Sequence, residues 1–260
     1  MRAHWPEYVI EAAGLGIFMV VACVFGAALS HPDSAVVHAL PNPLVRRTIM
    51  GLTMGLTAVT LIYSPWGRRS GAHFNPATTL TFWRLGKVAT RDAVAYVGAQ
   101  VLGGLAGVLL AAAIVGGALA HPDVRYVVTT PGTAGVPIAF LAESAITFLL
   151  MTVILRVSNC AAVARFTGLA AGVLVALYIT FEAPLSGMSM NPARSFASAL
   201  PAGAWDAFWI YVVAPPLGML AAAEVYSCRQ GERTVYCAKL HHDRRRRCIF
   251  RCRYTELIGR

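Results

Sequence analysis

The sequence predicts an all-α membrane protein with six transmembrane helices and two re-entrant half-helices arranged as an inverted repeat. Three observations predict it. The 260 residues are 57% hydrophobic and only 13% charged, which is too apolar for an ordinary soluble domain. Several apolar runs approach the roughly 20 residues that cross a bilayer. A short polar motif occurs twice between them.

Six apolar runs are separated by short links rich in Pro, Gly, Ser, Asp or Arg. The first run follows no basic segment and precedes no small-residue cleavage site, so we interpret it as a retained span rather than a signal peptide. The predicted spans are residues 8–29, 45–63, 93–119, 137–156, 166–184 and 206–227.

Basic residues near the ends of the spans predict the orientation, because they favour the cytoplasmic side. They gather before the first span, between the second and third, between the fourth and fifth, and after the sixth. We therefore expect a multi-pass protein of the cell membrane with both termini in the cytoplasm. Arg46 and Arg47 fall on the opposite side and are the local argument against this orientation.

The repeated motif reads S-G-x-x-x-N-P-A, and its two copies are 116 residues apart, at 70–77 and 186–193. Each copy follows a span that carries a Gly-x-x-x-Gly pair. Each repeat holds three spans, an odd number, so the second copy must enter the membrane inverted. We expect repeats at about 8–119 and 137–227 within a channel domain of residues 1–227, with their shared site near the midplane.

Asn followed by Pro indicates a helix start, because Asn is a preferred N-cap and Pro is tolerated at the first helical position. Pro76 and Pro192 each begin a helix of about nine residues, or ~13 Å, which reaches only the middle of a bilayer. Two such helices entering from opposite faces place their positive N-terminal ends together. The amides of Asn75 and Asn191 add N–H donors there.

Two N-P-A boxes in re-entrant halves of a six-span inverted repeat resemble the major intrinsic protein family, the aquaporins and aquaglyceroporins, in a bacterial-type form. The resemblance covers about residues 8–227. It implies an aquaporin-like fold and a homotetramer with one pore per protomer. It also matches Asn75 and Asn191 to the paired pore asparagines, and Arg194 to the arginine of the narrow filter near the outer mouth.

The other filter positions follow by counting along the same family pattern. Met188 falls at the loop position and Ile179 at the fifth-span position. The link before the first box is one residue longer than in typical water channels, which puts Met54 rather than Gly55 at the second-span position. A filter formed by Met54, Ile179, Met188 and Arg194 would be apolar with one cationic donor. The alternative for these Met and Ile side chains is plain core packing.

Three of the titratable residues in or beside the spans have candidate roles. Glu11 and Glu143 occupy the first span of each repeat, and the family uses such glutamates to brace the re-entrant loops through backbone N–H groups. A proton relay is the alternative. His73 precedes the first box, where we expect it to line the inner half of the pore or to brace its loop, with pH gating as the alternative. We also expect Pro76 and Pro192 to help to brace the re-entrant loops.

These features together predict a passive channel for water and small neutral solutes. Ser195 after the second box is typical of water channels. Glycerol or another small uncharged solute is the alternative, because the sixth span lacks the aromatic pair of water channels. An ion-coupled transporter is a remoter alternative, since it would need titratable groups at the midplane. No catalytic motif is present, so we expect no enzyme, and the channel needs no cofactor.

The last segment, residues 228–260, carries ten Lys and Arg against three Asp and Glu. We expect a disordered cytoplasmic tail that attracts anionic lipid. Nothing folded carries the charge, so we expect no nucleic-acid partner. Five side chains of the tail are potential zinc ligands, but their spacing matches no regular finger or ribbon, so we predict no metal site. They are Cys237, His241, His242, Cys248 and Cys252.

Overall fold

The structure is a computed structural model that describes residues 4–231 and 234–259. Within these residues the regular elements are all helical, and six helices are long and apolar enough to cross a membrane. This confirms the predicted all-α class. The six are α1 (Trp5–Ser30), α3 (Pro43–Tyr63), α6 (Thr90–Val115), α7 (Val136–Ser158), α8 (Thr167–Phe181) and α11 (Phe208–Gln230).

The observed spans differ from the predicted ones by a few residues at their ends. One difference follows α8, where the chain leaves the helix after Phe181 and starts the short helix α9 (Ala183–Ser186). Pro184 lies in the first turn of α9. Because proline has no N–H to donate to the preceding turn, it ends the hydrogen-bond ladder of α8. The predicted fifth span therefore stops short of residue 184.

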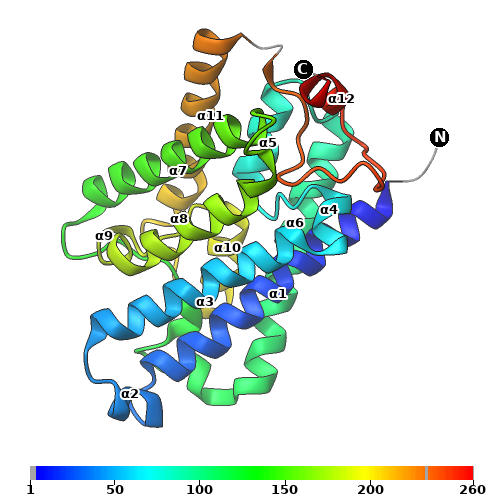
Figure 1. Cartoon of the computed structure of the whole chain (residues 1–260). Coiled ribbons are helices and arrows are strands. Elements are labelled where there is room, and N and C mark those ends of the chain that lie inside the picture. The colour runs from blue at the N-terminus through cyan, green and yellow to red at the C-terminus, as the bar shows by residue number, and fades with distance from the viewer. Residues whose placement is uncertain (1–3, 232–233, 260) are drawn as a thin grey trace.

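Two shorter helices occupy the middle of the bundle (Figure 1). They are α5 (Pro76–Arg84) and α10 (Pro192–Ala202), and each begins with proline directly after an asparagine N-cap. The half-helix α5 packs against α11, and α10 packs against α6. Each half-helix therefore contacts a long helix of the other repeat.

The remaining elements lie at the two ends of the bundle. The helix α2 (Ala35–Ala39) marks one end, which we name the α2 end, while the start of α1 and the helix α12 (Tyr254–Ile258) mark the other, the α12 end (Figure 1). Short helices complete the links. They are α4 (Pro65–Ser70), η1 (Gly116–Ala120), η2 (Arg125–Val127) and η3 (Ala164–Phe166).

The long helices pair in a way that repeats across the two halves. The helix α1 lies along α6 in the first half, and α7 lies along α11 in the second. The remaining pair, α3 and α8, joins one half to the other. The pairing follows the inverted repeat that the spacing of the two motifs predicts.

The contact between α3 and α8 depends on two glycines. A Cβ added to Gly55 would lie 2.5 Å from the backbone oxygen of Gly172, and one added to Gly172 would lie 2.7 Å from the backbone oxygen of Gly55. Real Cβ atoms do not approach backbone so closely. Small residues let helix backbones meet in a membrane, where van der Waals packing drives helix association. The two glycines therefore set the spacing between the halves.

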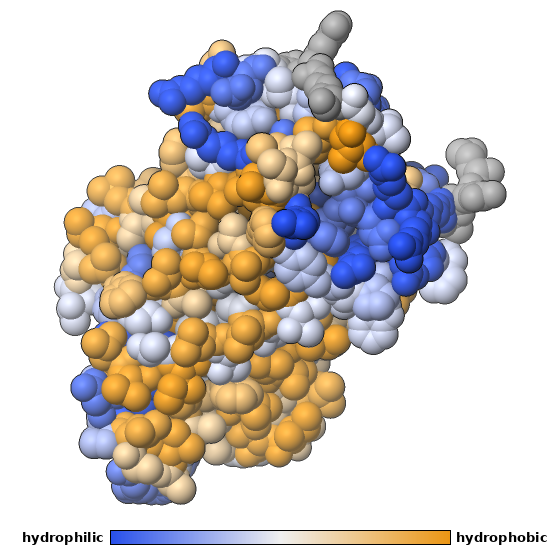
Figure 2. Space-filling model, in the orientation of Figure 1, coloured by the Kyte–Doolittle hydropathy of each residue, from blue (hydrophilic) through white to orange (hydrophobic). Residues whose placement is uncertain are grey.

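Figure 2 shows a wide apolar band between the two polar ends of the bundle. The fold leaves large apolar side chains exposed on several long helices, and Leu56, Leu102, Leu141 and Phe181 are each more than 60% exposed. Such an area of exposed apolar surface is typical of a surface that contacts lipid or other membrane helices.

The segment after α11 is folded in the structure, which differs from the expected disorder. We name its described residues, 234–259, the cap. The cap lies across the α12 end of the bundle and buries apolar side chains that include Val235, Leu240 and Phe250. The charge of the segment misled the expectation, because Arg244, Arg245 and Arg246 are exposed to solvent while residues 235–240 and Phe250 are buried.

The seam between α3 and α8 gives a testable prediction. Gly172→Ala places a methyl group against the backbone of Gly55 and should destabilise the protein by about 1–3 kcal/mol, the usual cost of overpacking. Gly98→Ala is the matched control, because a Cβ at Gly98 meets nothing within 4 Å. Thermal unfolding in detergent measures both, and equal midpoints for the two variants would refute this account of the seam.

Candidate functional site

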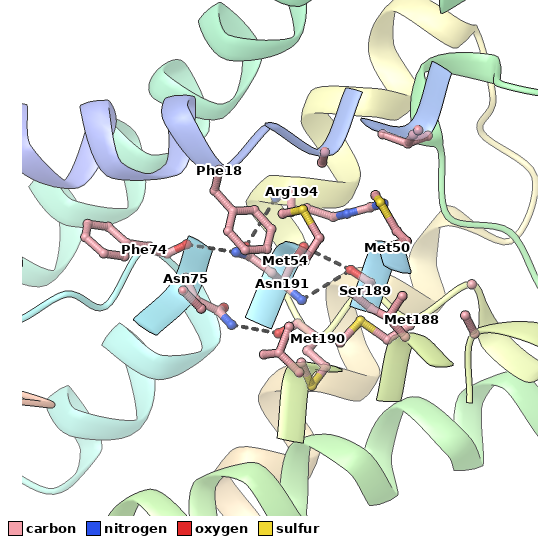
Figure 3. A pocket seen from close by; sticks show the side chains of 18 of the residues that line it. Phe18, Met50, Met54, Phe74, Asn75, Met188, Ser189, Met190, Asn191 and Arg194 are labelled. Atoms are coloured by element: carbon pink, nitrogen blue, oxygen red, sulfur yellow. Dashed lines mark hydrogen bonds between the residues drawn. The ribbon is translucent and has the colours of Figure 1, made fainter. Parts of the chain in front are cut away.

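The N-terminal ends of α5 and α10 meet in the interior of the bundle (Figure 3). The side-chain oxygen of Asn75 accepts a hydrogen bond from the N–H of Ala77 at 2.8 Å, which caps α5. The oxygen of Asn191 accepts from the N–H groups of Ala193 and Arg194 at 3.1 and 3.2 Å, which caps α10. Capping fixes both amides, so that their nitrogens point away from their own helices.

Each of the two amides then bonds to the opposite repeat. Asn75 Nδ2 donates to the carbonyl oxygen of Met190 at 2.7 Å, and Asn191 Nδ2 donates to the carbonyl oxygen of Phe74 at 2.8 Å. A side-chain amide carries two N–H groups. In the described residues one of them on each asparagine forms this cross-repeat bond, and the other remains for a solute in the cavity that both side chains line.

The loops before the two half-helices follow the same unusual backbone path. Ala72 and Phe74 have φ of 57° and 47°, and Met188 and Met190, 116 positions later, have φ of 51° and 55°. Left-handed backbone at a residue other than glycine costs on the order of 1–3 kcal/mol and persists where the surroundings hold it. Both loops must therefore be held by strong interactions.

Two buried carboxylates bond to these loops. Glu11 accepts hydrogen bonds from the N–H groups of His73 and Phe74 at 3.1 and 2.6 Å, and from the Ser70 hydroxyl at 2.7 Å. Gln100 Nε2 donates to the same carboxylate at 2.9 Å. A buried carboxylate that accepts several N–H bonds anchors a loop strongly, because charge-assisted bonds are about twice as strong as neutral ones.

Glu143 occupies the corresponding place in the second repeat. It accepts from the N–H groups of Ser189 and Met190 at 2.5 and 2.8 Å, and from the Ser186 hydroxyl at 2.9 Å. The side chain of Glu143 is fully buried. The two carboxylates thus satisfy matching backbone donors in the two loops.

His73 lies between its loop and the cap. One ring nitrogen, Nδ1, hydrogen-bonds with the Thr79 hydroxyl at 3.0 Å, and Nε2 bonds to the carbonyl oxygen of Ala238 in the cap at 2.8 Å. Its ring stacks on Phe82 on one side and Phe250 of the cap on the other. His73 therefore connects the first re-entrant loop to the cap.

A cavity of about 740 Å³ runs beside the meeting half-helices. At the α2 end its wall includes Pro32, Pro43 and Asp123, and toward the α12 end it includes Ile62 and Leu240. Asn75 and Asn191 lie between these two groups. The cavity is thus a lined passage that extends along the bundle past the tips of α5 and α10.

The other residues expected at the filter lie on the wall of the same cavity. Met54, Ile179, Met188 and Arg194 all line it. Figure 3 shows Met54 and Arg194 beside Asn191, and Met188 farther away, near Ser189. One guanidinium nitrogen of Arg194, Nη1, is buried without a hydrogen-bond partner in the described residues. This nitrogen is therefore hydrogen-bonding capacity beside the cavity that the described residues do not use.

Sequence reasoning missed several residues of the wall. Met50 lies one helical turn before Met54 and lines the cavity with it, as does Phe18 of α1. Residues four apart share a helix face, so the position of Met54 was a signal that also pointed to Met50. Leu240 of the cap had no such signal, because its place on the wall depends on how the cap folds.

The cap covers the α12 end of the cavity, which we name the inner mouth. It contacts four positions around this mouth. The N–H of Leu240 donates to the Gly71 oxygen at 3.1 Å, and the N–H of Arg251 donates to the Lys87 oxygen at 3.0 Å. The N–H of Tyr236 donates to the Asn159 side chain at 2.8 Å, and the ring of His241 packs on Tyr63.

One buried lysine adds to this attachment. Lys239 Nζ donates to the carbonyl oxygens of Arg68 and Arg247, at 2.7 and 2.6 Å, and so joins the cap to α4. Burial lowers the pKa of Lys239, because it penalises the charged form. The two carbonyl groups partly compensate the loss of water around the ammonium group.

Two inverted half-helices that meet beside a lined cavity, within six spans, define an aquaporin-like membrane protein. Comparison with known proteins agrees, since residues 2–226 match the family described as Major intrinsic protein. The chain belongs to this family.

Its similar relatives include plant proteins. The chain is 39% identical over 178 residues to aquaporin NIP1-3 of Oryza sativa subsp. japonica, covering 68% of this chain and 60% of the rice protein. It is 34% identical over 221 residues to the putative aquaporin NIP4-1 of Arabidopsis thaliana, covering 85% of this chain and 70% of that protein. These relatives do not support the expected bacterial-type form.

A solved structure agrees with the fold. The X-ray structure of the aquaglyceroporin from Plasmodium falciparum matches with a TM-score of 0.70 at 22% identity, covering 86% of this chain and 96% of that one. At this identity the likeness concerns the fold alone.

The bonds of Glu143 give a second prediction. Glu143→Ala would leave two loop N–H groups and one hydroxyl buried without acceptors, at about 1–3 kcal/mol each. We expect a fall of several kcal/mol in stability and loss of most of the folded protein. Glu224→Ala is the control, because Glu224 is half exposed and, among the described residues, its ion pair is with the exposed Arg84. Thermal unfolding in detergent compares them, and a Glu143→Ala variant as stable as the control contradicts the bracing.

Proposed function

We propose that the protein is a passive channel for water and small neutral solutes. The single observation that carries the proposal is the cavity that passes the tips of both half-helices, with Asn75, Asn191 and Arg194 on its wall. Each asparagine offers an amide N–H, and the loops offer carbonyl groups, so a hydroxylic molecule can exchange hydrogen bonds along the way.

Electrostatics support a channel for neutral molecules. The half-helices α5 and α10 direct their N-terminal ends toward each other, and each end carries a partial positive charge of about half a unit. The guanidinium group of Arg194 adds a full positive charge on the same wall. These charges favour the oxygen lone pairs of a solute and oppose protons and other cations.

Water is the solute that we propose first, and glycerol or a similar polyol is the alternative. The wall near Arg194 carries Met54, Ile179 and Met188, which are apolar. An apolar wall with one strong donor holds a solute weakly and so permits fast passage. The names of the relatives, aquaporin and aquaglyceroporin, refer to both classes of channel.

We assign supporting roles to the residues behind the passage. Glu11 and Glu143 brace the re-entrant loops, and Pro76 and Pro192 start the half-helices at the midplane. His73 braces the first loop through Thr79. These residues position Asn75 and Asn191 and need not contact the solute.

The proposal includes a cell-membrane location with both termini in the cytoplasm and assembly as a homotetramer. The distribution of charge supports the orientation. Arg68 pairs with Asp243 of the cap and Arg69 pairs with Glu7 near the start of α1, which puts both arginines at the α12 end. The exposed apolar band is available for contact between protomers and with lipid. The arginines of the cap would attract anionic lipid at about 1 kcal/mol each.

Stopped-flow light scattering on proteoliposomes tests the channel. Wild-type protein should accelerate osmotic water flow well above that of empty liposomes, because a channel lined with hydrogen-bonding groups spares water the apolar core of the bilayer. Glycerol gradients on the same vesicles decide between the two solutes. Vesicles that require a gradient of H⁺ or Na⁺ for transport would favour a coupled transporter instead.

Two variants test the residues of the passage. Arg194→Ala should relax selection among neutral solutes, because it removes the cationic donor from the wall. Asn191→Asp should admit cations or abolish conduction, because it adds negative charge between the half-helices. Arg91→Ala and Asn42→Asp are matched controls at exposed positions. Unchanged permeability in both passage variants would refute the assignment of the site.

A further inference from the structure

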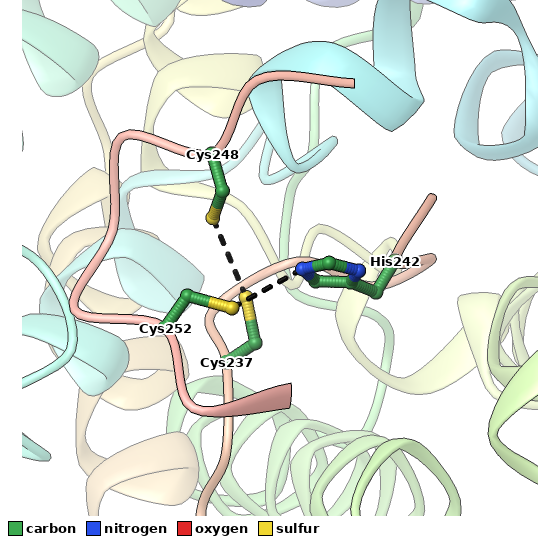
Figure 4. A group of neighbouring side chains, drawn as sticks. All are labelled: Cys237, His242, Cys248 and Cys252. Carbon is green, nitrogen blue, oxygen red and sulfur yellow. Dashed lines mark hydrogen bonds between the residues drawn. The ribbon is translucent and has the colours of Figure 1, made fainter. Parts of the chain in front are cut away.

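Four side chains that bind soft metal ions converge inside the cap (Figure 4). Cys237, His242, Cys248 and Cys252 each direct one ligand atom toward a common point, and these atoms lie within 4.8 Å of one another. Cys237 Sγ lies 3.7 Å from Cys248 Sγ, and His242 Nε2 lies 3.1 Å from Cys252 Sγ. The neighbouring His241 packs on Tyr63 instead and is not a member of the cluster.

The cluster has the composition and size of a structural zinc site. Three cysteines and one histidine are a common ligand set for Zn²⁺. Zn–S bonds of about 2.3 Å in a tetrahedron place two sulfur atoms ~3.8 Å apart, close to the distance between Cys237 and Cys248. Thiolate ligands favour Zn²⁺ over Mg²⁺ and Ca²⁺. Cys237 is buried and the other three are half-buried, which suits a closed site.

The cap has little regular secondary structure of its own. From residue 235 to residue 253 its described backbone forms neither helix nor strand. A segment of this size cannot bury enough apolar surface to fold by itself, and natural domains below ~40 residues usually need a disulfide or a metal. The exposed arginines also repel one another. A bound metal would supply the missing cross-link.

A disulfide explains the cluster less well. All six cysteines of the chain are free in the structure. A disulfide between Cys237 and Cys248 would use two of the four groups and leave Cys252 and His242 beside it without a role. With the proposed orientation the cap faces the cytoplasm, where thiols remain reduced.

The four ligands bracket the residues that attach the cap to the inner mouth. Between Cys237 and His242 lie Ala238 and Leu240, which bond to His73 and Gly71. Between Cys248 and Cys252 lies a second contact segment. It contains Phe250, which stacks on His73, and Arg251, which bonds to Lys87. A metal bound by all four side chains would fix both contact segments at once.

We propose that Cys237, His242, Cys248 and Cys252 bind one Zn²⁺ ion and that this ion fastens the cap across the inner mouth. Leu240 is then held on the wall of the cavity. Loss of the ion releases the cap and widens the mouth. This last consequence rests on the proposed channel function, whereas binding of the metal does not.

The first experiment measures metal in the full-length protein, purified in detergent without a histidine tag. Wild type should hold one Zn²⁺ per chain, and Co²⁺ substituted for it should give the visible bands of a tetrahedral thiolate site. Loss of a residue that only hydrogen-bonds to a metal ligand weakens metal binding by ~10–100-fold. His242→Ala and Cys248→Ser remove a ligand itself, so they should weaken Zn²⁺ binding by more than this. The matched controls His241→Ala and Cys160→Ser should bind as wild type does.

Three results of this experiment would overturn the metal site. The first is a wild-type protein that takes up no stoichiometric Zn²⁺. The second is a His241→Ala variant that loses as much metal as His242→Ala. The third is a disulfide among the three cysteines in protein kept under reducing conditions.

The second experiment tests whether the metal fastens the cap. Removal of Zn²⁺ with a chelator should speed hydrogen exchange at the N–H groups of Leu240 and Arg251, which bond to the inner mouth, and Zn²⁺ should restore protection. The same treatment should raise osmotic water flow several-fold in proteoliposomes. Unchanged exchange would refute the fastening role.

The permeability result separates the two proposals. Faster exchange with unchanged water flow would overturn the control of the mouth by the metal while supporting the fastening of the cap. Protein that passes no water with or without Zn²⁺ would contradict the channel function, while the metal content would still decide the metal site.

Discussion

Backbone that leaves regular helix inside a membrane has to find its hydrogen-bond partners within the protein, and the carboxylates of Glu11 and Glu143 supply them here. They accept the N–H groups of two loops whose residues adopt left-handed conformations. Because the loops are held, α5 and α10 can begin in the middle of the bundle. The positions of both asparagines, and of the cavity beside them, follow from this arrangement.

The need for hydrogen-bond acceptors is met in the same way in both repeats. Matching residues 116 positions apart share the same backbone conformation, and each loop has its own carboxylate. The places where the halves meet include the close backbone contact of Gly55 with Gly172 and the tips of the half-helices. A displacement at either place would alter the width of the cavity, since both halves contribute to its wall.

Features fixed by local sequence were predictable. Asn and Pro specify the starts of α5 and α10 through capping and the missing N–H of proline, and long apolar runs specify the six spans. Features fixed by contacts between distant residues were not. Ala238 meets His73 across 165 positions, and most of the cap has neither helical nor strand periodicity. Its fold, the place of Leu240 on the cavity wall and the convergence of Cys237 with Cys252 therefore had no local signal.

The crossed bonds of the two asparagines bear on how the chain is made. Asn75 donates to Met190, and Asn191 donates to Phe74, so neither half contains the acceptor that its own amide needs. While the ribosome is still translating the region between them, the first N-P-A box has been synthesised but its acceptor has not. The first repeat must therefore enter the membrane before the acceptor of the Asn75 amide exists. The two half-helices can form their crossed hydrogen bonds only after the second repeat has been synthesised and inserted.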